Sequence, residues 1–575
     1  MSAQHPRPSA PAAARRLSDV ILLAAVAVLL LPAASTPQTA LGAKWFRFVP
    51  EVIRQDATGP VRLEVAAKDV SSRVVFVYAP GATSPSGRGI ATYDLRDDGD
   101  GGDTLAGDGI FTVTLQASKL VGGLTEDDVF HRIVGFLYFY RGTEAAGPWQ
   151  VQAPVINNEI PPVTVRRLAS DVQASRHVVN IVDPEFQAIG DNGRAYRRFY
   201  DFFDDDYFGI NVVTLPSRFE NRYGGPLQSD ATGTGSITGG LNPMMGSGGG
   251  LFHVSAFPLL GYFDGAETGV NHELGHQWVN FLRAVPALST GAPHWPVSSL
   301  AGGVMGWSAS GGEGLDFRCL VTEESGALRM RPRTTQAEFT DFDLYLMGLL
   351  PADQVGDAFV LPNSTTGGLA CNGGLYTGAF QRVRIQDVIA AVGERVPAAG
   401  QARTRFRIAT IVVSQDGLLD DDAMAYIDYF AARMELTEET LIHSGYLKAT
   451  GKPFAVATRG LGSIDATVTP RTVRDFSMTV SPRQLSIIAN QPARFTIHLA
   501  PTSDGFTSPV SFECLASVGM RACTFDPPVA IPGTSGTDVV MTVPSNTTWQ
   551  TGYKWVVRAS AGNLRHSTDV VLNAR

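Results

Sequence analysis

Residues 271–278 read Asn-His-Glu-Leu-Gly-His-Gln-Trp, and this stretch sets the expected fold and chemistry of the chain. His272 and His276 stand four positions apart, and Glu273 directly follows the first of them. On an α-helix, positions i and i+4 lie one turn apart on the same face. Both imidazoles can therefore face one ion, and zinc suits neutral nitrogen ligands in a tetrahedral shell. The pattern predicts a zinc site on a helix.

The residues around this stretch favour a helix. Asp264 and Glu267 have the three-residue spacing of a capping box, and Pro286 limits the helix at its far end. Gly269 and Gly275 oppose it, because each glycine weakens a helix by up to ~1 kcal/mol relative to alanine.

Glu273 is the candidate general base. Its carboxylate would take a proton from a metal-activated water and pass it to the leaving amine. A catalytic zinc site of this kind needs a third protein ligand. His294 is favoured, because it lies 18 residues after His276 and the prolines and glycine between them let the chain turn back. The rival ligands are the carboxylates of Glu313, Asp316, Asp341 and Asp343.

The motif looks like that of the zincin class of metallopeptidases. "HELGHQW", then "HW" at His294, "VMGW" at 304–307 and "FDLYLMGLLP" at 342–351, resembles a group of exported bacterial zincin-like proteins over roughly residues 177–460. The resemblance implies a metallopeptidase fold. The metzincin continuation is absent, because Val279 and Leu282 replace its glycine and its third histidine.

The same resemblance gives roles to three further residues. A strand before the metal helix often lines the substrate groove in zincins, so His253 is expected either to bind substrate or to pack. Asp343, if not a ligand, could anchor an imidazole. Tyr345 could stabilise an oxyanion or belong to the apolar core.

The first 35 residues predict export. Arg15 and Arg16 precede an apolar run at 20–31, and small residues follow it, which is the layout of a secretory signal peptide. No later stretch approaches a membrane span, so the mature chain is expected to be soluble. The net charge of −9 argues against a nucleic-acid partner.

The flanking segments read as β-sandwiches. Short alternating strands separated by Gly, Pro and Asp clusters fill residues 44–162 and 474–575, and the second segment resembles the Ig-like modules of bacterial exported enzymes. The loop from Asp97 to Asp108 carries five carboxylates among glycines, so calcium is a second candidate metal beside zinc.

Four cysteines in an exported chain permit two disulfides. Three connectivities are possible, and the domain layout favours the local pairs Cys319–Cys371 and Cys514–Cys523. A further local signal is the acidic triplet starting at Asp420, which is expected to cap a helix.

Together these features predict a multi-domain chain: a signal peptide (1–35), an N-terminal β-sandwich (44–162), an α+β zincin-like metallopeptidase core (175–470) and a C-terminal Ig-like β-sandwich (474–575). The expected function is that of a secreted, extracellular zinc-dependent endopeptidase acting on a protein or peptide, with His272, His276 and His294 as metal ligands and Glu273 as catalytic residue. The alternative is a non-catalytic cell-surface or adhesion protein whose zinc site is structural.

Overall fold

The computed structural model describes residues 41–574 apart from a set of internal stretches. These stretches are residues 69–70, 79–90, 123–131, 157–159, 187–191, 219–221, 237–241, 260–261, 263–265, 280–281, 291–292, 307–318, 333–336, 363–370, 445–446, 473, 489–490, 503–504, 517–522 and 545–551. The expected signal segment (1–35) lies outside the described residues, as do Asp264 and two of the rival ligands, Glu313 and Asp316.

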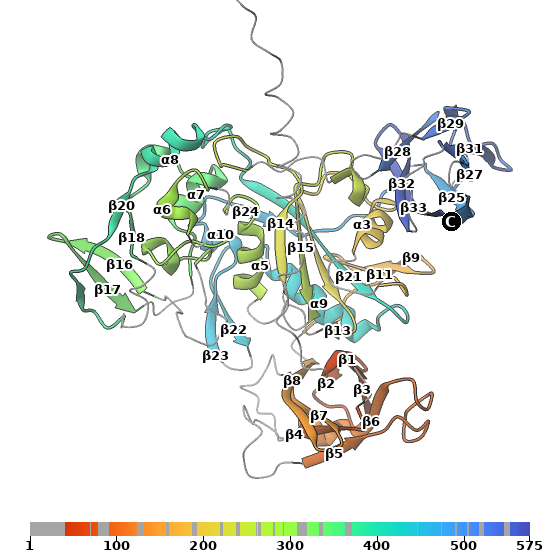
Figure 1. The fold of residues 1–575 in the computed structure, drawn as a ribbon, viewed down its shortest axis with the longest axis horizontal. Helices are drawn as coiled ribbons and strands as arrows, with labels where there is room; N and C mark the ends of the chain where they lie inside the picture. The colour runs from red at the N-terminus through yellow and green to blue at the C-terminus, as the bar shows by residue number, and fades with distance from the viewer. Residues whose placement is uncertain are drawn as a thin grey trace, which may run out of the picture.

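Strands dominate the molecule. Strand residues make up 42% and helical residues 16%, and the described strands form eight sheets (Figure 1). The expected fold class, with an α+β zincin-like core, is therefore wrong, and the chain is a mainly β protein of many sheets. The physical reason is that its helices are short. Helix α5 (Ala266–Gly275), which carries the motif, stops at Gly275 instead of continuing toward Pro286, because glycine disfavours helix continuation.

Two facing sheets form the N-terminal sandwich, in the strand orders β13-β1-β3-β6 and β2-β8-β7-β4-β5. A shared apolar core, which includes Phe48, Phe76 and Phe139, lies between them. The elements are β1 (Ala43–Val49), β2 (Ile53–Arg54), β3 (Pro60–Ala67), β4 (Arg73–Tyr78), β5 (Ala91–Leu95), β6 (Ile110–Gln116), α2 (Ala117–Val121), β7 (Arg132–Arg141) and β8 (Glu144–Ile156). The edge strand β13 (Ser217–Arg218) comes from much later in the chain.

The central sheet has eight strands in the order β14-β15-β12-β21-β11-β10-β9, with β24 also paired to β21. The pairs β15–β12, β12–β21 and β21–β11 are parallel, whereas β14 runs antiparallel to β15 at the edge. The strands are β9 (Arg166–Ala169), β10 (Val172–Ala174), β11 (Val178–Val182), β12 (Gly209–Thr214), β14 (Tyr223–Pro226), β15 (His253–Pro258), β21 (Arg405–Ser414) and β24 (Ser463–Asp465).

Helices cover both faces of this sheet, so its central strands are apolar on both sides. Neighbouring residues divide between two cores: Val178 packs with α5 and with α9 (Asp421–Arg433), and Val179 packs with α3 (Gly193–Tyr200) on the other face. Helix α9 begins as expected, with Oδ1 of Asp420 accepting a hydrogen bond from the backbone N–H of Ala423 at 2.8 Å.

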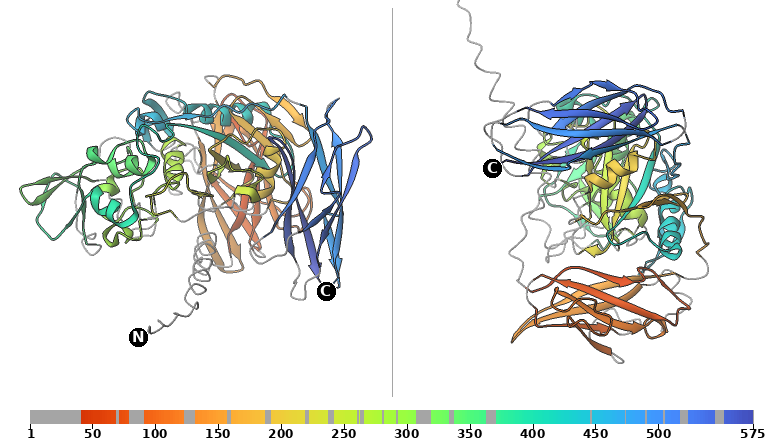
Figure 2. Two further views of the ribbon diagram at one scale, coloured as in Figure 1. Left: turned by 90° about the horizontal axis from the view of Figure 1, so that it is seen from above. Right: turned by 90° about the vertical axis from the view of Figure 1, so that its right-hand side faces the viewer.

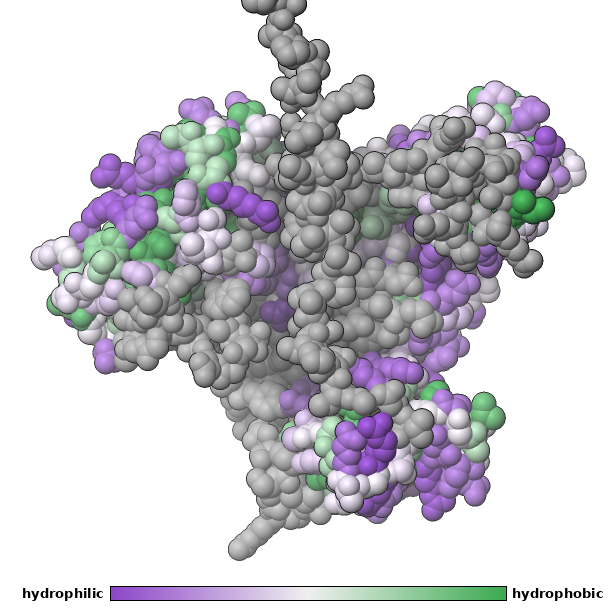
Figure 3. Space-filling view, in the orientation of Figure 1, coloured by the Kyte–Doolittle hydropathy of each residue, from purple (hydrophilic) through white to green (hydrophobic). Residues whose placement is uncertain are grey.

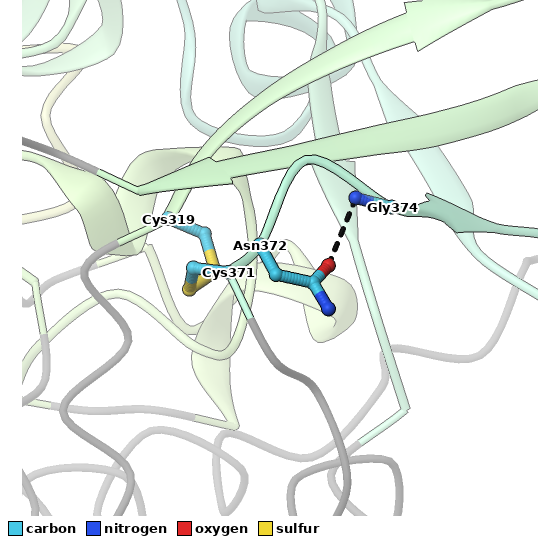
Figure 4. Close-up of a disulfide and its surroundings, with 4 residues drawn as sticks. All are labelled: Cys319, Cys371, Asn372 and Gly374. Carbon is cyan, nitrogen blue, oxygen red and sulfur yellow. Dashed lines mark hydrogen bonds between the residues drawn. A yellow bond between two sulfur atoms is a disulfide. The ribbon is translucent and has the colours of Figure 1, made fainter.

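A side lobe with β16 and β17 extends from the central unit (Figure 1), and it carries one of two disulfides (Figure 4). Cys319, at the start of β16, is bonded to Cys371, and the adjacent Asn372 accepts a hydrogen bond from the N–H of Gly374 at 2.9 Å. The lobe and its surroundings contain α6 (Pro286–Ser289), η3 (Ser299–Gly302), β16 (Cys319–Glu324), β17 (Ala327–Pro332), α7 (Asp341–Met347), η4 (Ala352–Gln354), β18 (Ala358–Val360), β19 (Leu375–Tyr376), β20 (Gln381–Val383) and α8 (Ile385–Val392). Elsewhere in the central part lie η2 (Asn242–Met245), β22 (Thr440–Ser444), β23 (Leu447–Gly451) and α10 (Phe454–Ala457).

The C-terminal sandwich packs beside α3, apart from the N-terminal one (Figure 2). Its sheets have the orders β25-β27-β31-β29 and β26-β33-β32-β28-β30, and Trp555 lies fully buried between them. The second disulfide, Cys514–Cys523, belongs to this unit, so both expected local pairings are confirmed. The strands are β25 (Phe476–Ser481), β26 (Gln484–Ile487), β27 (Ala493–Pro501), β28 (Val510–Ala516), β29 (Thr524–Asp526), β30 (Val529–Ala530), β31 (Thr537–Val543), β32 (Tyr553–Ala561) and β33 (Leu564–Ala574).

The surface shown in Figure 3 mixes hydrophilic and hydrophobic residues over the side lobe and over the two sandwiches. Within the described ranges, none of the helices has the length and apolar content needed to cross a bilayer. The two disulfides are typical of a protein that matures in an oxidising, extracytoplasmic compartment.

Candidate metal centre

The motif occupies the last turn of α5 and the turn that follows it. His272 and Glu273 lie within the helix, and His276 comes directly after its end at Gly275. The backbone N–H of His276 donates to the carbonyl of Glu273, and that of Gln277 to Leu274, so a tighter turn continues the chain. Trp278 is buried and anchors this turn in the core.

Two glycines allow close packing around α5. A Cβ atom at Gly275 would overlap the side chain of Met305, and one at Gly224 in β14 would overlap the backbone of Glu273. The helix therefore sits directly against the edge strand on one side and against Met305 on another. Close backbone approach of this kind requires residues without a side chain.

Three imidazoles converge at this point. The ring centroids of His272, His276 and His294 are 4.8 to 5.1 Å apart in each pair. One ligand atom from each lies within 4.8 Å of the others, and the Nε2 atoms of His272 and His294 are 3.0 Å apart. His276 is buried, whereas His272 and His294 are only partly buried, so the cluster is open on one side.

A backbone carbonyl fixes the tautomer of His272. Its Nδ1 lies 2.8 Å from the carbonyl oxygen of Val304. Because a carbonyl only accepts, Nδ1 carries the proton, and in the neutral ring Nε2 is left with a lone pair facing the other histidines. Burial lowers the pKa of His272 to about 4, and burial together with the charge of His272 lowers that of His294 to about 4. Both rings are neutral at pH 7, the form that binds metal.

Arg222 pairs with the candidate base. Its Nε donates to Oε1 of Glu273 at 2.9 Å, from a position just before β14. Burial raises the pKa of Glu273, and the charge and hydrogen bond of Arg222 oppose that rise. The positive charge of Arg222 also lowers the pKa of both His272 and His294, so one guanidinium lies close to the base and to the histidine cluster.

The rival carboxylates that the structure describes have other partners. Asp343 is fully buried: its Oδ1 accepts from the indole N–H of Trp295 at 2.7 Å, and its Oδ2 accepts from the N–H and hydroxyl of Thr340 as the capping box of α7. Burial raises the pKa of Asp343 to about 6. Asp341 accepts from Arg459 at 2.7 Å and from the backbone of Gly356. Asp343 thus anchors the neighbour of His294 through an indole, not through an imidazole.

His253 and Tyr345 are both buried. His253, at the start of β15, is 1% exposed and its Nε2 bonds to Ser255 Oγ at 2.7 Å, so it packs inside the protein. The hydroxyl of Tyr345 accepts from the backbone N–H of Arg395 at 3.1 Å inside the core.

The acidic loop also brings three carboxylates together, those of Asp97, Asp103 and Asp108. Backbone N–H groups already occupy the Asp97 and Asp103 oxygens; Gly107, for example, donates to Asp97 at 2.7 Å and Gly99 to Asp103 at 2.6 Å. In this loop the aspartates cap backbone turns, and these hydrogen bonds explain their presence without a metal ion. Calcium at this place remains a prediction from the sequence.

Sequence reasoning missed Arg222, Trp295 and the carbonyl of Val304. Arg222 lies 51 residues before Glu273, and only the register of β14 brings it to the helix. The "HW" and "VMGW" segments signalled Trp295 and Val304 without revealing their roles.

The donor set fits a zinc ion. Zinc–nitrogen bonds of about 2.0–2.1 Å can bridge the two nitrogens of His272 and His294, which are 3.0 Å apart. Three imidazoles, one of them oriented by a carbonyl on its far nitrogen, form the ligand type that zinc prefers.

Comparisons with known proteins add no functional evidence. No family model matches the chain, and no curated protein matches it. Among solved structures, it is similar to a conjugative transposon lipoprotein from Bacteroides eggerthii DSM 20697, with 9% identity over 17% of this chain and 96% of that chain and a TM-score of 0.15. It is also similar to domains 4 and 5 of the S-layer protein SbsC, with 15% identity over 19% of this chain and 57% of that chain and a TM-score of 0.14. A third similarity is to the BIgI domain of beta protein from S. agalactiae bound to CEACAM1, with 9% identity over 18% of this chain and 97% of that chain and a TM-score of 0.11. Likenesses this partial carry no argument about activity.

Proposed function

We propose that the protein is a secreted zinc-dependent endopeptidase. The observation that carries the proposal is the convergence of His272, His276 and His294 beside Glu273. Within the described ranges, no fourth metal-binding side chain joins this group, and two of the three rings are partly exposed. Three protein ligands with one position left open are typical of catalytic zinc, whereas structural sites are closed by four. The disulfides support the extracellular setting.

Each residue has a distinct task in this proposal. The three histidines hold the ion, and the carbonyl of Val304 keeps the lone pair of His272 directed at it. When bound, zinc supplies polarisation of the scissile carbonyl and a lower pKa for water. A carboxylate oxygen of Glu273 takes the proton from the attacking water and delivers it to the leaving amine nitrogen. Burial favours this task, because it raises the pKa of Glu273 and makes the carboxylate a better proton acceptor at neutral pH.

The test uses the purified mature chain. Its zinc content is measured by elemental analysis, and its cleavage of a broad peptide library by mass spectrometry. Glu273→Gln is expected to keep zinc and to lose about 100- to 10,000-fold in cleavage rate. His272→Ala is expected to lose zinc, while the exposed His498→Ala serves as the matched control and keeps it.

The adhesion alternative predicts a different result. A wild-type chain with one zinc per molecule that cleaves nothing in the library would support a structural metal site and overturn the peptidase proposal.

A further inference from the structure

Arg222 uses only one nitrogen of its guanidinium in the contact that holds it. Its Nε donates to Glu273, and its side chain is 37% exposed against 5% for Glu273. Among the described residues, its two terminal nitrogens have no hydrogen-bond or ion-pair partner. An arginine offers five N–H donors in a planar fork that matches a carboxylate. Part of that fork is therefore open to solvent beside Glu273.

The backbone on which Arg222 stands is fixed. Arg222 is followed by β14, which pairs with β15 in register, Tyr223 opposite Ala256 and Gly224 opposite Ser255. The missing side chain of Gly224 lets this strand lie directly on the backbone of Glu273. The guanidinium is thus held at the carboxylate of Glu273, the residue next to His272 in the chain.

The pair is exposed at one end only. The side chain of Arg222 reaches solvent, whereas the carboxylate of Glu273 is buried. The two terminal nitrogens of Arg222 can therefore receive a second carboxylate from the solvent side, as the planar fork of arginine allows.

We propose that Arg222 is a specificity-determining residue that binds a carboxylate of the substrate through its two terminal nitrogens. This inference rests on the proposed peptidase function. The carboxylate belongs either to an acidic side chain near the scissile bond or to the C-terminus of the peptide. The two sources share one chemistry, and matched peptides separate them.

Binding is measured first, without turnover. Glu273→Gln is titrated by calorimetry, with zinc and with chelator, against peptide pairs that differ in one group: Asp against Asn near the scissile bond, and a free against an amidated C-terminus. One acid member is expected to bind at least about tenfold more tightly than its partner, as a charge-assisted bidentate contact allows. Adding Arg222→Met to this variant is expected to bring the ratio to about one. Arg382→Met, an arginine of similar exposure on the side lobe, is the matched control and keeps the ratio.

Cleavage of the same pairs by the wild type gives the second readout. The preferred acid peptide is expected to have the higher kcat/KM, and Arg222→Lys is expected to retain part of that preference whereas Arg222→Met loses it. Equal binding of acid and amide peptides, or a preference that survives Arg222→Met, overturns the inference even if the wild type cleaves both. Absence of cleavage with the binding preference intact would instead reject the peptidase function alone.

Discussion

The indole N–H of Trp295 donates to Oδ1 of Asp343 at 2.7 Å, so the residue next to His294 is tied to a fully buried carboxylate. Asp343 is held in turn by Thr340 at the start of α7. The position of His294 therefore depends on a hydrogen-bond chain that ends in the apolar core, and supporting contacts of this kind tune metal affinity.

Trp295→Phe removes the indole N–H and leaves a carboxylate oxygen of Asp343 buried without its donor. We expect zinc affinity to fall about 10- to 100-fold and the free energy of unfolding to fall by about 1–3 kcal/mol. Chelator competition and urea unfolding measure the two effects. Trp149→Phe, in the N-terminal sandwich, controls for general destabilisation and should leave zinc affinity alone. If the zinc affinity of Trp295→Phe is unchanged, the hydrogen bond to Asp343 does not support the metal site.

Zinc should stabilise the fold through the three histidines. At a free zinc concentration of 100 times Kd, binding to the native state adds about 2.7 kcal/mol to the free energy of unfolding. Thermal unfolding with zinc and with chelator should therefore give a higher Tm for the wild type with zinc. The difference should vanish in His294→Ala. A zinc-dependent shift of equal size in that variant would mean that the ion binds elsewhere.

Gly275→Ala tests the contact between α5 and Met305. Alanine alone would favour a helix by ~1 kcal/mol over glycine, but here the added methyl group overlaps the Met305 side chain. We expect net destabilisation of about 1–3 kcal/mol, measured by urea unfolding. Met305→Ala in the same chain should recover part of the loss. A more stable single variant would show that Met305 moves aside freely.

His566 should make stability depend on alkaline pH. It bridges Asp201, at the end of α3, and Asp475, through Nδ1 and Nε2 at 2.8 and 2.9 Å. Burial lowers the pKa of His566, but the hydrogen bonds and charges of the two aspartates outweigh it and raise the pKa to about 9. The folded-state pKa is thus above the unfolded value of about 6.5. The stabilisation is complete below pH 6.5 and is lost as the pH rises through 9.

The size of this effect is on the order of 3 kcal/mol at most. Urea unfolding of the wild type between pH 6 and 10 should show the loss, and His566→Gln should flatten the profile. His498→Gln, whose exposed ring pairs with Asp538, is the control and should keep the wild-type slope.

The two disulfides should differ in their contribution to stability. Cys319 and Cys371 are 52 positions apart, and Cys514 and Cys523 only 9. Because a longer closed loop restricts the unfolded chain more, Cys319→Ser with Cys371→Ser should cost about 4 kcal/mol. The double serine variant of Cys514 and Cys523 should cost less. The urea midpoints of the two double variants test this order. A lower midpoint for the Cys514 and Cys523 variant would mean that the disulfides act mainly on the native state and not on the unfolded chain.

The sequence could predict those features of the structure that depend on local patterns. The helix cap at Asp420 follows from neighbouring residues and both disulfide pairings follow from the domain layout, and the structure contains them. The four-residue spacing of His272 and His276 suffices to predict that their rings share one side, because helix geometry fixes it. The length of α5 was not predictable from the motif, since Gly275 ends the helix where apolar periodicity alone would extend it.

Long-range relations could not be predicted in the same way. Arg222 reaches Glu273 only through the register of an edge strand, and Asp343 serves an indole because α7 happens to face Trp295. The fold class was wrong for a related reason. A short motif describes one helical turn, whereas the balance of strands and helices depends on several hundred residues whose pairing no local pattern specifies.

The pairing of β13 with β1 has a consequence for how the protein is made. Trp45 and Phe46 find their partners in Arg218 and Ser217, which are synthesised about 170 residues later. While the chain emerges from the ribosome, the N-terminal sandwich can assemble its other strands, but β1 lacks its β13 neighbour and is an edge strand. An uncovered edge strand is a template for unwanted association. A fragment that stops before Ser217 should therefore be prone to self-association.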